Sequence, residues 1–143
     1  RARVEEKNVG GGHGADAQGK AAETGKHVAA IESDLGAPHP MGFRAKIRAE
    51  ATVRLQPVLD VLQPAGSNLI VLSSDSPEAD IEPFANQGVP AFGLLQDGRT
   101  YFNYHHTAAD TLDKIIPREL RENATAMAVM GYALAAMPDP LPR

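Results

Sequence analysis

Along the chain, short runs of apolar residues alternate with longer amphipathic stretches. An apolar run of about four to eight residues between turn signals is typical of a buried strand in a parallel sheet. Three runs fit, and we expect strands at His27–Glu32, Leu69–Leu72 and Ala91–Leu95. The segment Gly36–Gly42 should be a loop, because its prolines disfavour both helix and central strand.

A helical spacing of apolar residues marks two other stretches. In Glu50–Leu62 the apolar residues form such a stripe, and Pro57 must kink or restart the helix. Pro117 suits the first turn of a second helix. Its core-facing stripe is expected to be Leu120, Ala124, Met127, Met130, Leu134 and Met137. Shorter helices are expected at Ala15–Thr24 and Asp80–Asn86.

Strands that alternate with helices indicate an α/β fold with a largely parallel sheet. Ligands of such sheets bind outside the carboxyl ends of the strands, and Asp34 directly follows the first expected strand. The pair Asp97-Gly98 predicts a hairpin turn and places Tyr101–Tyr104 on an antiparallel or edge strand. The proline-rich residues 138–143 predict a stiff, exposed tail.

Composition narrows the classes of function. The chain has no cysteine, so metal binding is left to His, Asp and Glu. Its net charge is −4 with scattered basic residues, which gives no basic stripe for nucleic acid. The longest apolar run, Ala124–Met137, is shorter than the ~18 residues that a membrane-spanning helix needs. A small-molecule or peptide substrate fits this composition best.

Residues that can do chemistry concentrate in Tyr101–Thr111, where His105 and His106 stand between an aromatic run and Asp110. Imidazoles titrate near neutral pH and bind metals, but a histidine pair alone is more often structural. The Glu5-Glu6 pair, taken alone, is more often a solvated charge cluster than a site. Neither motif identifies a function by itself.

Four motifs in this order resemble a known family: Glu5-Glu6, Glu32-Ser33-Asp34, Gly88-Val89-Pro90 and His-His-Thr-Ala-Ala-Asp-Thr-Leu from His105. From about Val4 to its end, the chain resembles the C-terminal part of a co-catalytic di-zinc exopeptidase. The family is that of plasma glutamate carboxypeptidase and the bacterial zinc aminopeptidases, and it is related to the transferrin receptor. The resemblance implies a three-layer αβα sandwich with a mixed, largely parallel sheet. Residues 1–143 would be the C-terminal portion of this single catalytic domain, without its N-terminal part.

The resemblance also implies roles for individual residues. Glu5 would be the general base, and Glu6 and His106 would share one zinc ion. Asp34 would bind the second zinc ion. The resemblance places Asp110, His105 and Asp80 either behind the metal ligands or in the substrate pocket. Glu6, Asp34 and His106 should therefore converge at one edge of the sheet.

The resemblance implies the activity of a zinc-dependent exopeptidase, either an aminopeptidase or a carboxypeptidase, which hydrolyses peptides or dipeptides. It also implies that the complete enzyme is secreted or periplasmic. In the family, the first zinc histidine and the bridging aspartate lie upstream of the glutamate pair, so the fragment alone is expected to be inactive. One alternative is a metal-free binding or structural homologue, against which the retained residues argue: Glu5, Glu6, Asp34 and His106. The other is a zinc-dependent acyltransferase that resembles glutaminyl cyclase, which no sequence feature favours.

Overall fold

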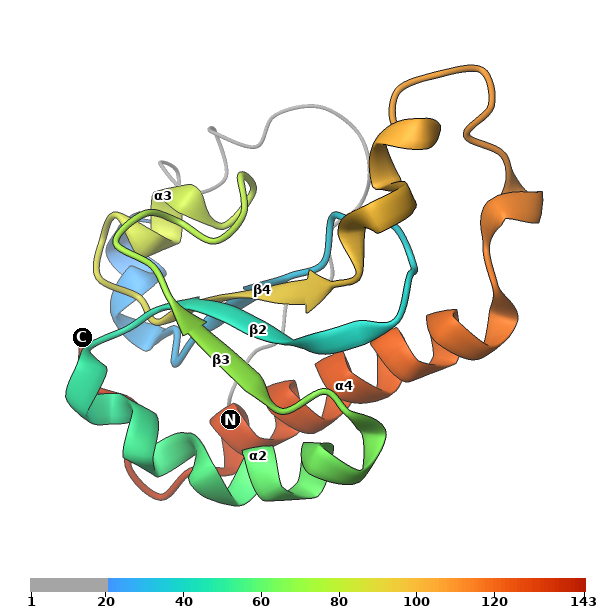
Figure 1. The fold of residues 1–143 in the computed structure, drawn as a ribbon. Helices are drawn as coiled ribbons and strands as arrows, with labels where there is room; N and C mark the ends of the chain where they lie inside the picture. The colour runs from blue at the N-terminus through green and yellow to red at the C-terminus, as the bar shows by residue number, and fades with distance from the viewer. Residues whose placement is uncertain (1–20) are drawn as a thin grey trace.

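The computed structural model describes residues 21–143 and builds them around a four-stranded sheet with the order β1-β4-β2-β3 (Figure 1). The strands are β1 Ala30–Glu32, β2 Pro40–Lys46, β3 Leu69–Leu72 and β4 Ala91–Gln96. β1 is parallel to β4 and β2 is parallel to β3, whereas β2 and β4 are antiparallel. The sheet is therefore mixed and largely parallel, as expected.

Helices cover both faces of the sheet. α2 Gln56–Leu62 and α4 Pro117–Ala136 lie against one face, and α3 Glu82–Ala85 lies on the other (Figure 1). Short 3-10 helices connect these elements: η1 Ala21–Lys26, η2 Ala49–Leu55, η3 Gln63–Ala65, η4 Gly98–Asn103 and η5 Leu112–Lys114. Within residues 21–143, no helix has the length and apolar character that crossing a membrane would require.

The main core lies between the sheet and the helices η2, α2 and α4. Phe43, Phe92 and Leu94 point from the sheet into this core and are fully buried. Burying a side chain of this size contributes about 1.5–3 kcal/mol to the free energy of unfolding. The stripe expected in Glu50–Leu62 is confirmed, because its buried residues are Ala51, Leu55, Val58 and Leu62. Pro57 stands at the start of α2, where it restarts the helix.

The prediction of a loop at Gly36–Gly42 is wrong for its last residues, because the interior strand β2 begins at Pro40. Proline is tolerated as the first residue of a strand. Gly42 has φ +149°, and a Cβ there would lie 2.1 Å from the carbonyl oxygen of Leu69 in β3. A register shift between Pro40 and Gly42 accompanies this close approach. Gly42, within the segment expected to be a loop, thus allows β2 and β3 to pair closely.

The expected hairpin after β4 is also wrong. Asp97 instead caps η4, since its side chain accepts a hydrogen bond from the backbone N–H of Arg99. Residues 101–103 are therefore helical rather than extended. Strand β3 exists as expected but is an edge strand, and 51% of Leu69 and 45% of Leu72 are exposed.

Two expectations about the C-terminal region need correction. The buried stripe of α4 is rotated from the expected one and consists of Asn123, Ala126, Met130 and Leu134. The proline-rich end is not a free tail. Leu141 is buried, and Arg143 donates hydrogen bonds to the carbonyl oxygens of Thr24 and His27. Arg54 also donates to the carbonyl oxygen of Pro140, at 2.9 Å, so the end of the chain is part of the fold.

Candidate functional site

Two segments meet beyond the carboxyl ends of β1 and β4. Residues 33–38 follow β1, and residues 98–116 follow β4 as an arm that projects from the sheet (Figure 1). Because β1 and β4 are parallel neighbours, both segments start at the same edge. A cavity of about 460 Å³ lies between them, and we call it the His106 cavity. Its wall consists of residues 33–38, 100–101, 104–106, 110, 114–116 and 119.

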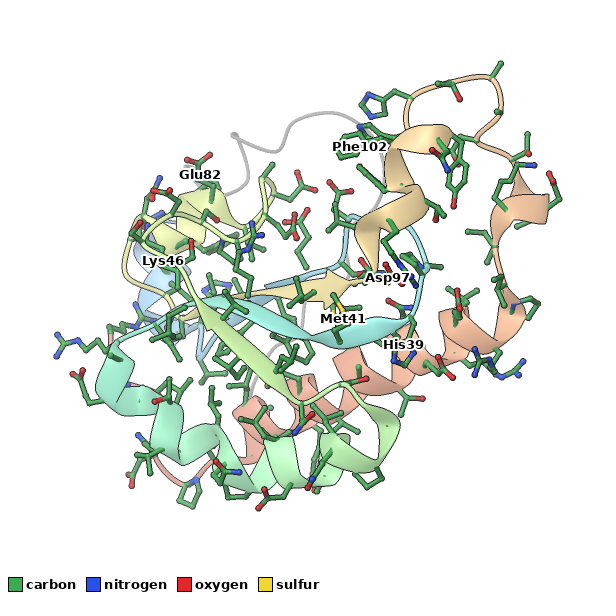
Figure 2. The ribbon with its side chains drawn as sticks, in the orientation of Figure 1. His39, Met41, Lys46, Glu82, Asp97 and Phe102 are labelled. Atoms are coloured by element: carbon green, nitrogen blue, oxygen red, sulfur yellow. The ribbon has the colours of Figure 1, made fainter. Side chains whose placement is uncertain are left out.

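The arm begins with a fixed helical turn. The Nε of Arg99 donates hydrogen bonds of 2.8 and 2.9 Å to the carboxylate of Asp97. These contacts hold the pKa of Asp97 below its usual range. The backbone N–H of Asp97 donates to the carbonyl oxygen of His39 at 3.0 Å. Figure 2 shows Asp97 and His39 together at the end of the sheet, with Phe102 further out on the arm.

The two histidines of the arm form part of a stack of rings. Tyr101 stacks on His105 with ring centroids 4.3 Å apart, and His105 stacks on His106 at 3.8 Å. Among the described non-glycine residues, only His106 has a positive φ, of 55°. A backbone held in this region costs about 1–3 kcal/mol and is common at functional sites. His106 lines the His106 cavity and is exposed to solvent.

Glu32, at the end of β1, ties a second loop to this edge. Its Oε2 accepts hydrogen bonds from the backbone N–H groups of Asp80 and Ile81, at 3.0 and 3.1 Å. Burial raises the pKa of Glu32, and the charge of Asp80 raises it further. The loop between β3 and α3 is therefore held beside the strand end that carries Asp34.

Glu78 of that loop lies over strand β4. A Cβ added to Gly93 would be 2.7 Å from the Cγ of Glu78, so the glycine makes room for this side chain. Burial raises the pKa of Glu78 to about 7, and the charges of Glu32 and Asp34 add to the rise. The positive charge of Arg44 opposes them.

The Tyr101 hydroxyl lies near the same negative charges. Burial raises its pKa, and the charges of Asp34, Glu78 and Asp110 raise it further. These carboxylates come from three different segments, so several negative charges lie around the Tyr101 hydroxyl.

The structure brings together several of the residues singled out in the sequence. Asp34, His105, His106 and Asp110 all line the His106 cavity. Asp80 does not line it, and its backbone is bound by Glu32 instead. Asp110 directly precedes Thr111, the N-cap of η5. The remaining two, Glu5 and Glu6, lie outside the described residues.

The donors in the His106 cavity fit zinc in kind. Asp34 offers carboxylate oxygens and His106 an imidazole nitrogen, which are the zinc ligands open to a chain without cysteine. Within residues 21–143, however, no group of three or more His, Asp or Glu side chains is placed to hold a metal ion. A zinc site here needs further ligands from outside the described part of the chain.

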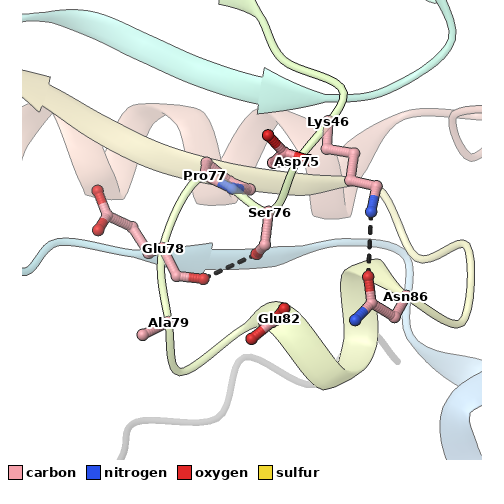
Figure 3. A pocket seen from close by; sticks show the side chains of 8 residues that line it. All are labelled: Lys46, Asp75, Ser76, Pro77, Glu78, Ala79, Glu82 and Asn86. Atoms are coloured by element: carbon pink, nitrogen blue, oxygen red, sulfur yellow. Dashed lines mark hydrogen bonds between the residues drawn. The ribbon is translucent and has the colours of Figure 1, made fainter.

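Sequence reasoning missed Glu78 and Tyr101 as neighbours of the site. Tyr101 stood in the aromatic run before the histidines, which was a usable signal, whereas nothing in the sequence marked Glu78. Glu78 also lines a second cavity of about 430 Å³, between the β3–α3 loop and α3 (Figure 3). There Lys46 Nζ donates to Asn86 Oδ1 at 3.1 Å, and Ser76 Oγ donates to the carbonyl oxygen of Glu78 at 2.7 Å (Figure 3).

Comparison with known proteins identifies relatives. The family model described as peptidase family M28 matches residues 3–130. Carboxypeptidase Q of Bos taurus is 31% identical over 122 residues, and that of Homo sapiens is 33% identical over 113. These matches cover 85% and 79% of this chain but only 25% and 24% of the relatives. The chain thus spans about a quarter of the length of the curated relatives it matches.

A solved structure shares the fold. The crystal structure of a peptidase M28 precursor from Shewanella amazonensis SB2B, at 1.70 Å resolution, matches with a TM-score of 0.77 and 30% sequence identity. The match covers 92% of this chain and 30% of that chain.

Proposed function

Because the chain belongs to peptidase family M28, we propose that it is the C-terminal portion of the catalytic domain of a zinc-dependent exopeptidase. Its substrates would be peptides or dipeptides. The similarity to carboxypeptidase Q favours release of the C-terminal residue. The observation that carries the proposal is that Asp34 and His106, 72 positions apart (106 − 34), line one cavity together with Asp110.

Each residue has a distinct role in this proposal. Asp34 would hold one zinc ion, and His106 together with Glu6 would hold the other. Zinc bound there would supply Lewis acidity for the water and for the carbonyl oxygen of the scissile bond. Glu5 takes a proton from the attacking water and delivers it to the departing amine. Asp110 orients the His106 imidazole or its loop.

His105 supports this arrangement through its stacking. It lies between Tyr101 and His106, so it limits the rotation of the His106 ring. The resemblance alone assigns Asp80 to the substrate pocket; its backbone N–H is bound by Glu32 at the end of β1, and it does not line the His106 cavity.

The proposal limits what the 143-residue chain can do alone. The remaining zinc ligands would be supplied by residues that precede it, so the chain by itself should bind zinc weakly and have negligible peptidase activity. The complete enzyme would be secreted or periplasmic, which fractionation of the producing cells can test.

The decisive experiment uses the complete protein. Zinc content is measured together with amino-acid release from free dipeptides, and N-blocked dipeptides serve as the substrate control. Glu5→Gln should retain zinc and lose turnover, because it removes the proton relay without removing a ligand. Glu50→Gln, an exposed carboxylate on η2, is the matched control and should remain active.

The outcomes separate the candidate functions. Unchanged turnover in a zinc-replete Glu5→Gln protein would reject Glu5 as the base. A protein without zinc or hydrolysis would be the metal-free homologue, whereas cyclisation of N-terminal glutamine with one bound zinc would indicate the acyltransferase.

A further inference from the structure

A pair of buried amides connects the elements around the His106 cavity. Gln96, the last residue of β4, is 2% exposed, and Asn123 of α4 is 5% exposed. Gln96 Nε2 donates to Asn123 Oδ1 at 2.5 Å and to the carbonyl oxygen of Gly36 at 2.8 Å. Asn123 Nδ2 donates to the carbonyl oxygens of Pro38 and Glu119, both at 2.7 Å. Because a primary amide has two N–H donors, all the donors of both side chains are used.

Two of the acceptors belong to the loop that carries Asp34. Within the described part of the chain, residues 35–38 form no backbone–backbone hydrogen bond. The two amides therefore provide the polar anchors of this loop. The next residue, His39, accepts the N–H of Asp97, and its Nδ1 lies 2.9 Å from the carboxylate of Glu122. The loop is thus fastened to the end of β4 and to α4 at neighbouring positions.

The same amides adjoin the arm on the other side of the cavity. Gln96 directly precedes Asp97, which caps η4, and η4 leads to the stacked ring of His105. The carbonyl that Asn123 binds on its own helix belongs to Glu119, a residue of the cavity wall. One hydrogen-bonded pair therefore contacts the Asp34 loop directly and lies at the base of the His106 arm.

Packing alone does not explain these residues. Asn123 stands in a buried helical stripe whose other members are apolar: Ala126, Met130 and Leu134. Among the described residues, Gln96 Oε1 has no hydrogen-bond partner although it is buried. Burying polar atoms costs free energy, most of all when one is left unpaired, so an apolar side chain would serve packing better.

We propose that Gln96 and Asn123 are positioning residues, which hold the Asp34 loop at a fixed separation from the His106 arm so that both donors meet at the metal centre. This inference rests on the proposed function, because it gives the fixed separation its purpose. All four N–H donors of the pair are used, so directed hydrogen bonds hold the Asp34 loop to β4 and α4. Removing groups that orient metal ligands typically lowers metal affinity or activity by about 10–100-fold.

The first test measures the separation without any metal. This chain has no cysteine, so in a complete protein whose cysteines elsewhere are replaced by serine, Ser33→Cys and Ala108→Cys create a unique pair of labelling sites, one on each side of the cavity. Both positions are exposed. Nitroxide labels on them report the distribution of distances between the loop and the arm by electron paramagnetic resonance. The complete protein is used, in the presence of a chelator.

Gln96→Met and Asn123→Leu are the test variants, because each replaces an amide by an apolar side chain of similar size. Asn123→Leu leaves the Gln96 to Gly36 hydrogen bond available, so it is the milder of the two. Val58→Ala is the matched control: it destabilises the core through α2 without touching the loop. The distance distribution should broaden in both test variants and stay narrow in Val58→Ala.

The second test measures the zinc dissociation constant of the unlabelled variants by competition with a chelator, at a temperature where circular dichroism shows them folded. Both test variants should bind zinc about tenfold or more weakly, and Val58→Ala should match the unsubstituted protein. Unchanged distributions, or broadened distributions with unchanged zinc affinity, would overturn the positioning role. If the unsubstituted protein binds no zinc, the proposed function fails, and the distance distributions alone still decide whether the amides fix the loop.

Discussion

Removing the charge of Glu78 should stabilise the protein above neutral pH and have little effect in acid. Burial and the charges of Glu32 and Asp34 raise the pKa of Glu78 from 4.5 to about 7 in the folded state. Because the folded pKa lies above the unfolded one, the folded state loses stability as pH rises from about 4.5 to 7 and levels off above that range. Glu78→Gln removes this loss, since glutamine has nearly the same shape and does not ionise.

The magnitude follows from the change in pKa. A difference of one pKa unit corresponds to about 1.4 kcal/mol, so the full change would be about 3 kcal/mol. Glu78 is only half-buried, and solvent screening reduces this figure to about 1–2 kcal/mol at pH 8.

Urea unfolding of the chain and of Glu78→Gln at several pH values between 4.5 and 8, with a chelator present, gives the difference in the free energy of unfolding. Glu82→Gln is the control, because it removes one exposed carboxylate from the same cavity. The free energy of unfolding of Glu78→Gln should exceed that of the unsubstituted protein by an amount that grows between pH 4.5 and 7. If this difference does not grow, the reasoning is refuted.

Two further substitutions test the fold by the same urea measurement. Gly42→Ala should lower the free energy of unfolding by about 3 kcal/mol or more, because the φ of +149° is strained for alanine and its Cβ would overlap the Leu69 backbone; a loss below about 1 kcal/mol would contradict that packing. Leu62→Ala should cost about 2–5 kcal/mol because Leu62 is 2% exposed. Phe102→Ala should change stability by no more than about 0.5 kcal/mol because Phe102 is 82% exposed; equal losses in these two variants would show that the core is assigned wrongly.

The elements that the sequence predicted well are those determined by their own residues. Strand Leu69–Leu72 and the restart at Pro57 depend on local patterns of apolar residues and on the geometry of proline. Strand β2 was missed because its signal lies in a contact 27 positions away (69 − 42), between Gly42 and Leu69. The Asp97-Gly98 pair was misread because aspartate serves equally well in a hairpin turn and as a helix cap, and only the contacts of the arm select the cap.

The candidate site divides in the same way. Asp34 could be placed because one rule of α/β sheets puts ligands at the carboxyl ends of strands, and His106 because a motif surrounds it. Gln96 and Asn123 carry no motif, and their hydrogen bonds to Gly36 and Pro38 span 60 and 85 positions. A chain can show which donors it offers, but the separation of two donors on different loops depends on distant buried groups. Residues that fix such a separation are therefore visible only once the fold brings them together, which is why the amide pair, rather than another motif, is the informative place to perturb this site.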